Sequence, residues 1–579
     1  MSSIDTLKIK KLFQEERFSE IIFEIESLTS EKNRSPTLYN LLGVCRASQK
    51  GRSKRDIEHA FEDFETAFEK DNLGEISLEA LCNHIKLCAE MGRRESDLIN
   101  KMIIAEKMYL KAEKKFSDNE RFILTGLDMY KYLLKHEERI KKVDQLINKK
   151  KLNKILGTIY IVTHLYTNKW GQKDFWEFQK KFTKVFKVYN AKKLSKIDIN
   201  KKKIKVGFLS SDYLRSHSVT YFITNLIKDL KHTKFETHGL SLLKSNEHDE
   251  TTEKFITLFD NWIVLGEKTD QDIINIIQDL NIDILIDLTG LFGNNRVNIF
   301  NTRICPLQIS WLGFNHSTGL KEVDYILADK NTVKDEEKYY GSKIYKLPKI
   351  FNSHRGFEHK RYFNELPYKK NGYFTFGSLN NFMKINDEVL DVWTKILKKV
   401  KNSRIILKSS LNVCEDVIMK KFEKEGLINC VEILKKTKGN DFLSHINVYD
   451  KIDLCLDPFP FSGVTTSCEA LWKNVPVVNK TGYNFITRTG ESIMKNANLN
   501  NFIATSNDEY IEKAVFFANN IDELEKVRKE LFDKVLETPL FDTTSFSNDF
   551  CEALENMLNS KLKNTKTKSE FFNSMNKPS

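Results

Sequence analysis

The stretch "DPFPFSGVTTSCEALW", Asp457–Trp472, combines residue types that suit the binding of an anion. Two of the chain's 9 prolines stand here, followed by Gly463 and by a pair of threonines, Thr465 and Thr466. Prolines fix the backbone of a turn, and a glycine permits another group to approach the backbone closely. Free N–H groups and hydroxyls at the start of a helix favour a phosphate. The alternative is that one of the threonines only caps the helix.

Two other segments place polar groups directly after an apolar run. In "FGSLNNFMKIND" the run is followed by Asn381 and Lys384, an amide and a cation that suit a diphosphate. In a lysine-rich chain, surface charge is the alternative for Lys384. In "VGFLSSDYLRSHSVTYF" the run is followed by His217, whose imidazole suits a general base or a group that binds the acceptor. A purely structural role is the alternative for this single histidine.

The elements that must position these residues are short strands alternating with helices. From about residue 200, β-branched runs alternate with helical segments in two successive series, separated by "NELPYKKNG". This is the pattern of parallel sheets, and it predicts an α/β region of two Rossmann-like lobes. The first series is "KVGFLS", "THGLSLL", "IDILIDL", "LQISWLG" and "DYILAD", and the second is "YFTFGSL", "SRIILKS", "CVEILK", "DLCLD", "VPVVN" and "NFIAT". Ligands of such folds gather at the carboxyl ends of the strands.

The first 150 residues predict an all-α region of helix after helix. A spacing of small and aromatic residues occurs twice in it, as Ala60, Phe64, Ala67 and as Ala105, Tyr109, Ala112. Small residues let the helices of a hairpin approach closely, and the aromatic residue fills the gap between hairpins. The spacing resembles degenerate tetratricopeptide repeats, and a generic helical domain is the alternative.

The composition is that of a globular protein, with 40% hydrophobic and 30% charged residues. No apolar run approaches the roughly 20 residues of a membrane-spanning helix, and the N-terminus has no apolar signal core. We therefore expect a cytoplasmic protein. The net charge of +12 comes from lysines scattered among 80 acidic residues, which favours a solvated surface over a nucleic-acid site. The 9 cysteines form no C-x-x-C pair, so we expect reduced, buried thiols.

Taken in order, the segments resemble the catalytic region of the SPINDLY/O-linked N-acetylglucosamine transferase family, especially its bacterial members. The resemblance covers about residues 200 to 560, and the helical repeats before it complete the family's layout. It is carried by "KVGFLSSDYLRSHSVTYFI", "DILIDLTGLFGNNRVNIFNTRICPLQISWLGF", "VDYILAD", "FTFGSLNNFMKI" and "DLCLDPFPFSGVTTSCEALWKNVPVV".

The resemblance implies a GT-B glycosyltransferase with two Rossmann-like lobes and a nucleotide-sugar donor held mainly by the second. It implies no required metal and no cofactor beyond the donor. Lys384 would stabilise the departing diphosphate beside Asn381, and Gly463, Thr465 and Thr466 would form its phosphate-binding helix start.

Three more roles follow from the same resemblance. Glu469 would bond the ribose hydroxyls, His445 would stack on the nucleotide base, and His217 would be the catalytic histidine at the lobe interface.

The implied domains are a tetratricopeptide-like region at 1–150 and a helical linker at 151–200, then an acceptor-side lobe at 201–365. A nucleotide-sugar lobe at 366–560 and a polar, poorly ordered tail at 561–579 complete the chain.

We expect a protein glycosyltransferase that moves one sugar with inversion, with UDP-N-acetylglucosamine or a related hexosamine as the donor. Its acceptor would be Ser or Thr of a protein, such as a flagellar or surface protein. GDP-fucose as the donor, or UDP-glucose transferred to Asn, is the alternative within enzymes, and an inactive peptide-binding scaffold is the alternative outside them. Self-association through the repeats stays open. Three departures from the family pattern leave the sugar and the acceptor open too. They are Asn315 with His316, Leu291, and a His217 loop that is one residue longer than in the animal enzymes.

Overall fold

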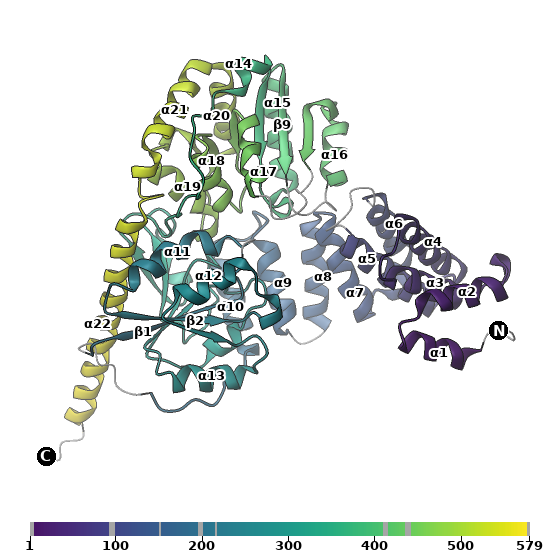
Figure 1. The fold of residues 1–579 in the computed structure, drawn as a ribbon, viewed down its shortest axis with the longest axis horizontal. Helices are drawn as coiled ribbons and strands as arrows, with labels where there is room; N and C mark the ends of the chain where they lie inside the picture. The colour runs from purple at the N-terminus through teal and green to yellow at the C-terminus, as the bar shows by residue number, and fades with distance from the viewer. Residues whose placement is uncertain are drawn as a thin grey trace. The chain divides into compact units, whose positions relative to one another are not determined.

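The computed structural model describes residues 5–91, 99–149, 152–194, 201–214, 217–408, 415–434 and 442–575 (Figure 1). The chain forms two compact units. The first is Met1–Lys151 with the short segments Asn381–Asn386 and Lys408–Lys436, and the second is Leu152–Asn380, Asp387–Leu407 and Thr437–Ser579.

The first unit is helical, as predicted. Its helices have polar starts typical of their type: a Ser53 side chain caps α4 within a capping box, and Ser35 precedes Pro36 at the start of α3. The helices are α1 (Thr6–Gln14), α2 (Phe18–Leu28), α3 (Pro36–Ser48), α4 (Lys54–Lys70), α5 (Glu75–Met91), α6 (Ile99–Phe116), α7 (Glu120–Tyr132) and α8 (His136–Lys149). The segment Lys408–Lys436 adds α16 (Glu415–Lys424) and β10 (Val431–Leu434).

The repeated small and aromatic residues lie where helices of this unit touch. The Phe64 ring of α4 packs on Gly43 of α3, where a Cβ would lie 2.5 Å from a ring carbon. The Tyr109 hydroxyl of α6 packs on Gly126 of α7, where a Cβ would lie 2.4 Å away. Both aromatic side chains are buried, together with all four alanines of the pattern. The spacing therefore marks real helix–helix contacts, although the glycine helix precedes the aromatic helix in one case and follows it in the other.

The second unit begins with two helices that the sequence suggested were a linker. Leu152 starts this unit, and α9 (Lys154–His164) and α10 (Gln172–Phe182) contribute Ile161, Phe175 and Phe182 to the core of the first lobe. The expectation of a linker was wrong because lysines mask an amphipathic pattern: α10 buries only one face.

The first lobe is a seven-stranded parallel sheet in the order β3-β2-β1-β4-β5-β6-β7. The order reverses between β1 and β4, which makes the space after these two strands a topological switch point. The elements are β1 (Ile204–Ser210), α11 (Val219–Leu230), β2 (Phe235–Ser241), α12 (Glu250–Leu258), β3 (Asn261–Val264), α13 (Asp270–Asp279), β4 (Ile284–Asp287), β5 (Leu307–Ser310), β6 (Tyr325–Asp329) and β7 (Lys343–Leu347).

The second lobe repeats this design with parallel strands in the order β9-β8-β11-β12-β13. Its switch point lies between β8 and β11. The elements are α14 (Pro367–Asn371), β8 (Phe374–Ser378), α15 (Asp387–Lys399), β9 (Ser403–Lys408), α17 (Phe442–Ile446), β11 (Leu454–Leu456), α18 (Thr465–Trp472), β12 (Val477–Lys480), α19 (Phe485–Asn496), β13 (Ile503–Ala504), α20 (Asn507–Asn519) and α21 (Ile521–Lys534). The predicted α/β class with two Rossmann-like lobes is confirmed.

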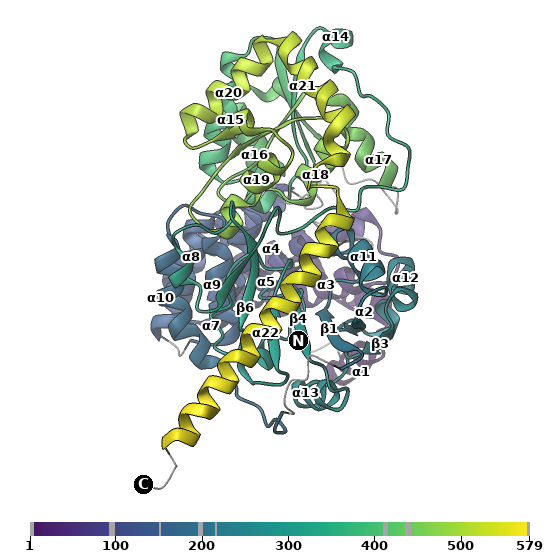
Figure 2. The same cartoon turned by 90° about the vertical axis from the view of Figure 1, so that its left-hand side faces the viewer.

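The last helix of the described residues is the long α22 (Thr543–Met575), which leaves the second lobe and runs along the first (Figure 2). It packs against α11, β5 and β7 of that lobe. Residues 561–575 of the predicted polar tail continue this helix, and their poor order stays a prediction.

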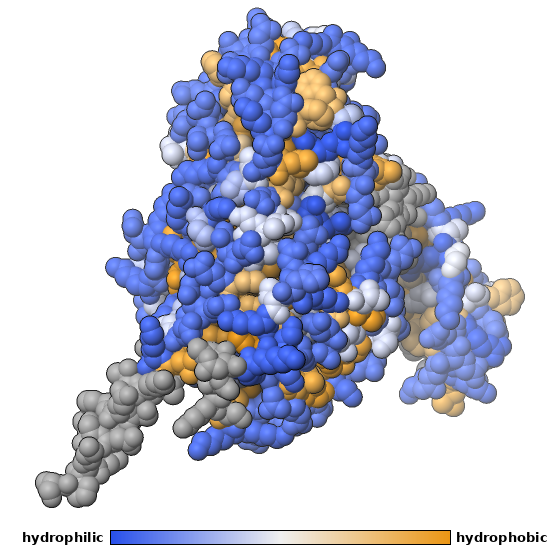
Figure 3. Space-filling model, turned by 60° about the vertical axis from the view of Figure 1, so that its left-hand side comes forward, coloured by the Kyte–Doolittle hydropathy of each residue, from blue (hydrophilic) through white to orange (hydrophobic). Residues whose placement is uncertain are grey.

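The surface agrees with a solvated, polar exterior. On the face shown in Figure 3, apolar side chains form scattered patches between hydrophilic ones. In the described ranges, no helix is both long and apolar enough to cross a bilayer. The cysteines of the described part are free thiols, and most of them are buried, as predicted.

Candidate functional site

The Pro/Gly segment joins β11 to α18 at the switch point of the second lobe. Helix α18 begins at Thr465, its N-cap is Val464, and no side chain caps it. Within the part of the chain that the structure describes, the N–H groups of Thr465, Thr466 and Ser467 have no hydrogen-bond acceptor. Side-chain capping by either threonine, the alternative weighed from the sequence, is therefore not what the structure shows. These N–H groups and the helix dipole suit an anion.

The carboxylate of Asp457 fixes the loop that leads into α18. It accepts hydrogen bonds from the Gly463 N–H at 2.8 and 3.0 Å and from Asn479 Nδ2 at 2.8 Å. A Cβ on Gly463 would lie 2.6 Å from both Asp457 Oδ1 and Thr466 Oγ1. The groups that approach Gly463 closely are thus the Asp457 carboxylate and the Thr466 hydroxyl. A role of Gly463 in binding a ligand stays a prediction.

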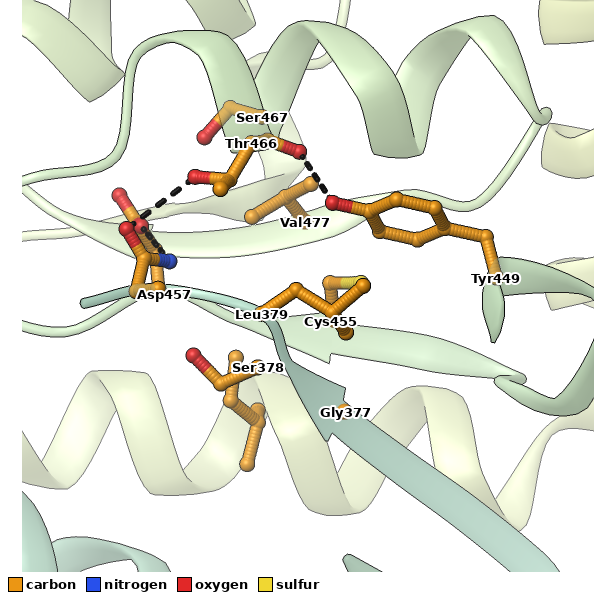
Figure 4. A pocket seen from close by; sticks show the side chains of 11 residues that line it. Gly377, Ser378, Leu379, Tyr449, Cys455, Asp457, Thr466, Ser467 and Val477 are labelled. Carbon is orange, nitrogen blue, oxygen red and sulfur yellow. Dashed lines mark hydrogen bonds between the residues drawn. The ribbon is translucent and has the colours of Figure 1, made fainter. Parts of the chain in front are cut away.

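A hollow lies between the ends of β8 and β11 and the first turn of α18 (Figure 4). Its wall includes Asn380, Thr466 and Ser378. The Thr466 hydroxyl donates to Asn380 Oδ1 at 3.1 Å. The Ser378 hydroxyl is buried and has no hydrogen-bond partner among the described residues, so it can bind a ligand atom or a water molecule.

The two residues expected to hold the nucleoside lie in contact. His445, from α17, places Nε2 at 3.2 Å from Oε2 of the buried Glu469 of α18. The same carboxylate oxygen accepts a hydrogen bond from the Tyr449 hydroxyl at 3.1 Å. Burial raises the pKa of Tyr449 well above its usual value, so this phenol stays a donor. Tyr449 also donates to the Thr466 carbonyl and so ties the pair to the start of the helix.

Asn381 and Lys384 lie on the short segment Asn381–Asn386, which belongs to the first unit. Asn381 is exposed, and its side chain accepts the Met383 N–H at 3.0 Å as the cap of a single 3-10 turn that ends at Lys384. Lys384 is half-buried. The placement of these two residues beside a diphosphate stays a prediction.

The switch point of the first lobe gathers a second polar cluster at the ends of β1 and β4. His217 Nε2 lies 3.6 Å from Asp212 Oδ1, and its Nδ1 accepts the Val219 N–H at 3.4 Å. Asp212 also accepts hydrogen bonds from Ser211 and Thr289. The His217 side chain is 43% exposed, so it is open to a substrate.

Asp287, at the end of β4, accepts the N–H groups of Thr289 and Gly290 at 3.0 and 3.1 Å. Burial, with a smaller contribution from the charge of Asp212, raises the pKa of Asp287 to about 6. The first lobe therefore places a histidine and two carboxylates at the carboxyl ends of its central strands. These residue types can carry out proton transfer.

The departures noted in the sequence lie in the core of this lobe. Leu291 packs in its hydrophobic cluster, and His316 is fully buried against Phe175 and Tyr340. Burial lowers the pKa of His316 to about 4. Asn315 is buried as well, and none of these three residues takes part in the hydrogen bonds of the first-lobe cluster.

Sequence reasoning missed three residues of the α18 site: Asn380, Asp457 and Tyr449. Asn380 stands beside Asn381, and only the end of β8 decides which of the two amides enters the hollow. For Asp457 a signal existed, because a carboxylate between an apolar strand and a Pro/Gly turn needs donors when it is buried.

The fold is that of the two-lobed GT-B glycosyltransferases. A solved structure of a mutant of the Thermobaculum terrenum O-GlcNAc transferase has a TM-score of 0.73 and 21% sequence identity, and the match covers 93% of this chain and 100% of that one. The model of glycosyl transferase family 41 matches residues 178–371 and 360–550. The chain therefore belongs to glycosyl transferase family 41, and the predicted family is confirmed.

Plant SPINDLY proteins are among its relatives. The chain is 29% identical to the Solanum lycopersicum protein over 383 residues, which are 64% of this chain and 40% of that protein. It is 30% identical to the Arabidopsis thaliana protein over 361 residues, 61% of this chain and 39% of that protein. The chain thus spans about two fifths of the length of the curated relatives that it matches.

Proposed function

We propose that the chain transfers one sugar from a nucleotide diphosphate to a protein hydroxyl, and that α18 holds the diphosphate. The observation that carries this proposal is the uncapped start of α18 at the switch point of a family 41 lobe. Three N–H groups, the Thr465 hydroxyl and the helix dipole converge there. Such groups stabilise the negative charge that develops on a departing diphosphate.

The neighbouring pair extends this site to the nucleoside. The Glu469 carboxylate is an acceptor only, so it suits the two donor hydroxyls of a ribose. His445 presents a half-exposed ring beside it, which suits a nucleotide base. UDP-N-acetylglucosamine is the donor we propose, because the relatives are named as probable UDP-N-acetylglucosamine–peptide N-acetylglucosaminyltransferases. GDP-fucose and UDP-glucose stay the alternatives.

The reaction we propose is a direct displacement with inversion. A Ser or Thr hydroxyl attacks the anomeric carbon, the bond from that carbon to the phosphate oxygen breaks, and the diphosphate leaves with the electron pair. The hydroxyl proton passes to a base, for which His217 is the candidate. Lys384 and the start of α18 neutralise the leaving group, so that the displacement needs no metal ion.

The test is incubation of the protein with UDP-N-acetylglucosamine, UDP-glucose and GDP-fucose in the presence of a mixture of Ser/Thr-rich and Asn-rich peptides. Released nucleotide and the mass of each peptide are measured. We expect one donor to be consumed and a peptide to gain one sugar. Lys384→Ala is expected to lower the rate about 100-fold or more, whereas Lys395→Ala, an exposed lysine of α15, serves as the matched control.

The outcomes distinguish the proposed O-glycosyltransferase from an N-glucosyltransferase and from an inactive scaffold. Binding of peptides without consumption of any donor would favour the inactive scaffold. Nucleotide release at an unchanged rate in Lys384→Ala would remove that lysine from the site. A sugar found on Asn instead of Ser or Thr would favour the N-glucosyl alternative.

A further inference from the structure

The side chains of Thr466, Asn380 and Asp457 form a line of hydrogen bonds at the start of α18. Figure 4 labels Thr466 and Asp457 at the two ends of this line. Asn380 Nδ2 donates to Asp457 Oδ1 at 3.3 Å, and the Thr466 hydroxyl donates to Asn380 Oδ1 at 3.1 Å. The Asp457 carboxylate is 1% exposed and Asn380 is 5% exposed. Water therefore competes little with these bonds.

The direction of the line follows from chemistry. An ionised carboxylate only accepts hydrogen bonds, so the amide atom of Asn380 that faces Asp457 must be the nitrogen. The amide oxygen then faces Thr466, and an oxygen of this kind only accepts. The proton of the Thr466 hydroxyl must therefore point at Asn380, away from any ligand.

The anchor of the line resists rotation. Asp457 also accepts from the Gly463 N–H and from Asn479 Nδ2, on two other elements. Asn479 is itself held against Gly490, where a Cβ would lie 2.0 Å from its amide nitrogen. With both carboxylate oxygens bonded, the amide of Asn380 gains nothing by turning over.

We propose that Asp457 and Asn380 are positioning residues that give the two adjacent threonines different tasks. Thr465, whose hydroxyl has no hydrogen-bond partner among the described residues, donates to the diphosphate. The Thr466 hydroxyl donates its hydrogen bond to Asn380 instead and holds the helix start in place. This inference rests on the proposed function, because it assigns donors within the proposed diphosphate site.

The experiment compares Thr465→Val with Thr466→Val, two nearly isosteric changes at neighbouring positions. Binding of UDP, GDP, UMP and GMP is measured by calorimetry, and the melting temperature of each protein is recorded. Thr465→Val is expected to weaken diphosphate binding about tenfold or more, because a hydrogen bond to a charged group is lost. Its preference for diphosphate over monophosphate falls with it, and its melting temperature stays that of the native protein.

The opposite pattern is expected for Thr466→Val. Its melting temperature falls, because the buried Asn380 Oδ1 loses the hydrogen bond from the Thr466 hydroxyl, and diphosphate binding weakens at most about threefold. Thr466→Ser retains the hydroxyl and is expected to restore the melting temperature. In the Asn380→Ala protein the hydroxyl of Thr466 is released toward the ligand, so Thr466→Val then costs more diphosphate affinity than it does in the native protein.

Equal losses of diphosphate affinity in the two valine variants, with unchanged melting temperatures, would overturn the inference and leave the proposed function standing. Failure of Asn380→Ala to alter the effect of Thr466→Val would overturn it too. A native protein that binds neither diphosphate would instead contradict the proposed function, and the inference with it.

Discussion

Glu469 and His445 meet through one carboxylate oxygen, which the Tyr449 hydroxyl also reaches. We predict that Glu469→Gln weakens the binding of UDP or GDP about tenfold, because an amide replaces one of two acceptor oxygens for the ribose. Binding of inorganic pyrophosphate, which has no ribose, is expected to stay unchanged. Calorimetry with both probes checks this, with Glu512→Gln on the exposed side of α20 as the control. Equal losses for both probes would remove Glu469 from the ribose.

Asp287 allows a prediction about pH. An unfolded aspartate titrates near 3.9, whereas burial raises the folded pKa of Asp287 to about 6. The folded state therefore binds more protons between these values, and the stability present below about pH 4 is lost as the pH rises through 6. Asp287→Asn keeps an oxygen for the Thr289 and Gly290 N–H groups and removes this dependence.

We therefore expect the difference in unfolding free energy between Asp287→Asn and the native protein to change with pH. From pH 5 to pH 8 it shifts by about 1.5 kcal/mol in favour of the variant. Urea unfolding at both pH values measures the difference. Asp63 and Asp453, whose pKa values burial also raises to about 6, are present in both proteins and cancel in the comparison. A difference that is the same at both pH values would contradict the assignment.

At the scale of elements, the contact between α3 and α4 depends on a small residue facing a large one. Gly43→Ala would push a methyl group into the Phe64 ring, and we predict a loss of about 1–3 kcal/mol in unfolding free energy. Phe64→Leu removes the ring edge. The double variant is therefore expected to lose less than the sum of the two single variants, which chemical unfolding can measure. Strict additivity would show that the two residues do not touch.

Most strands could be predicted because they are buried. Every apolar run named from the sequence corresponds to a strand, whereas β3 and β7 were missed. These two lie at the edges of the first sheet and are largely half-buried or exposed, so their sequences, "NWIV" and "KIYKL", carry no continuous apolar run. The helix start at Thr465 was predictable from its turn residues, but the partner of Thr466 was not. That partner depends on how the end of β8 meets β11, a contact between segments far apart in the chain.

At the scale of the molecule, the two lobes of the second unit are joined by α19. Ser492 of this helix donates to Asp329 of β6 at 2.5 Å, and Glu491 binds Lys334 at 3.0 Å. Asp329 is fully buried and also accepts the Phe351 N–H. These contacts hold the second lobe to the first around a carboxylate that has no access to water.

We predict that Ser492→Ala lowers the unfolding free energy by about 1–3 kcal/mol, because Asp329 loses a donor in a buried site. Ser218→Ala, at an exposed helix start without a side-chain cap, is the matched control and should change little. Differential scanning calorimetry distinguishes the two. A native-like melting temperature for Ser492→Ala would mean that this contact between the lobes is dispensable.

The start of α18 is where we propose that the diphosphate of a sugar donor binds. A crystal structure with UDP or GDP at saturating concentration tests it most directly. We expect a phosphate within hydrogen-bond distance of the N–H groups of Thr465 and Thr466 and of the Thr465 hydroxyl, with the ribose at Glu469. A nucleotide bound elsewhere, or none bound at all, would contradict it.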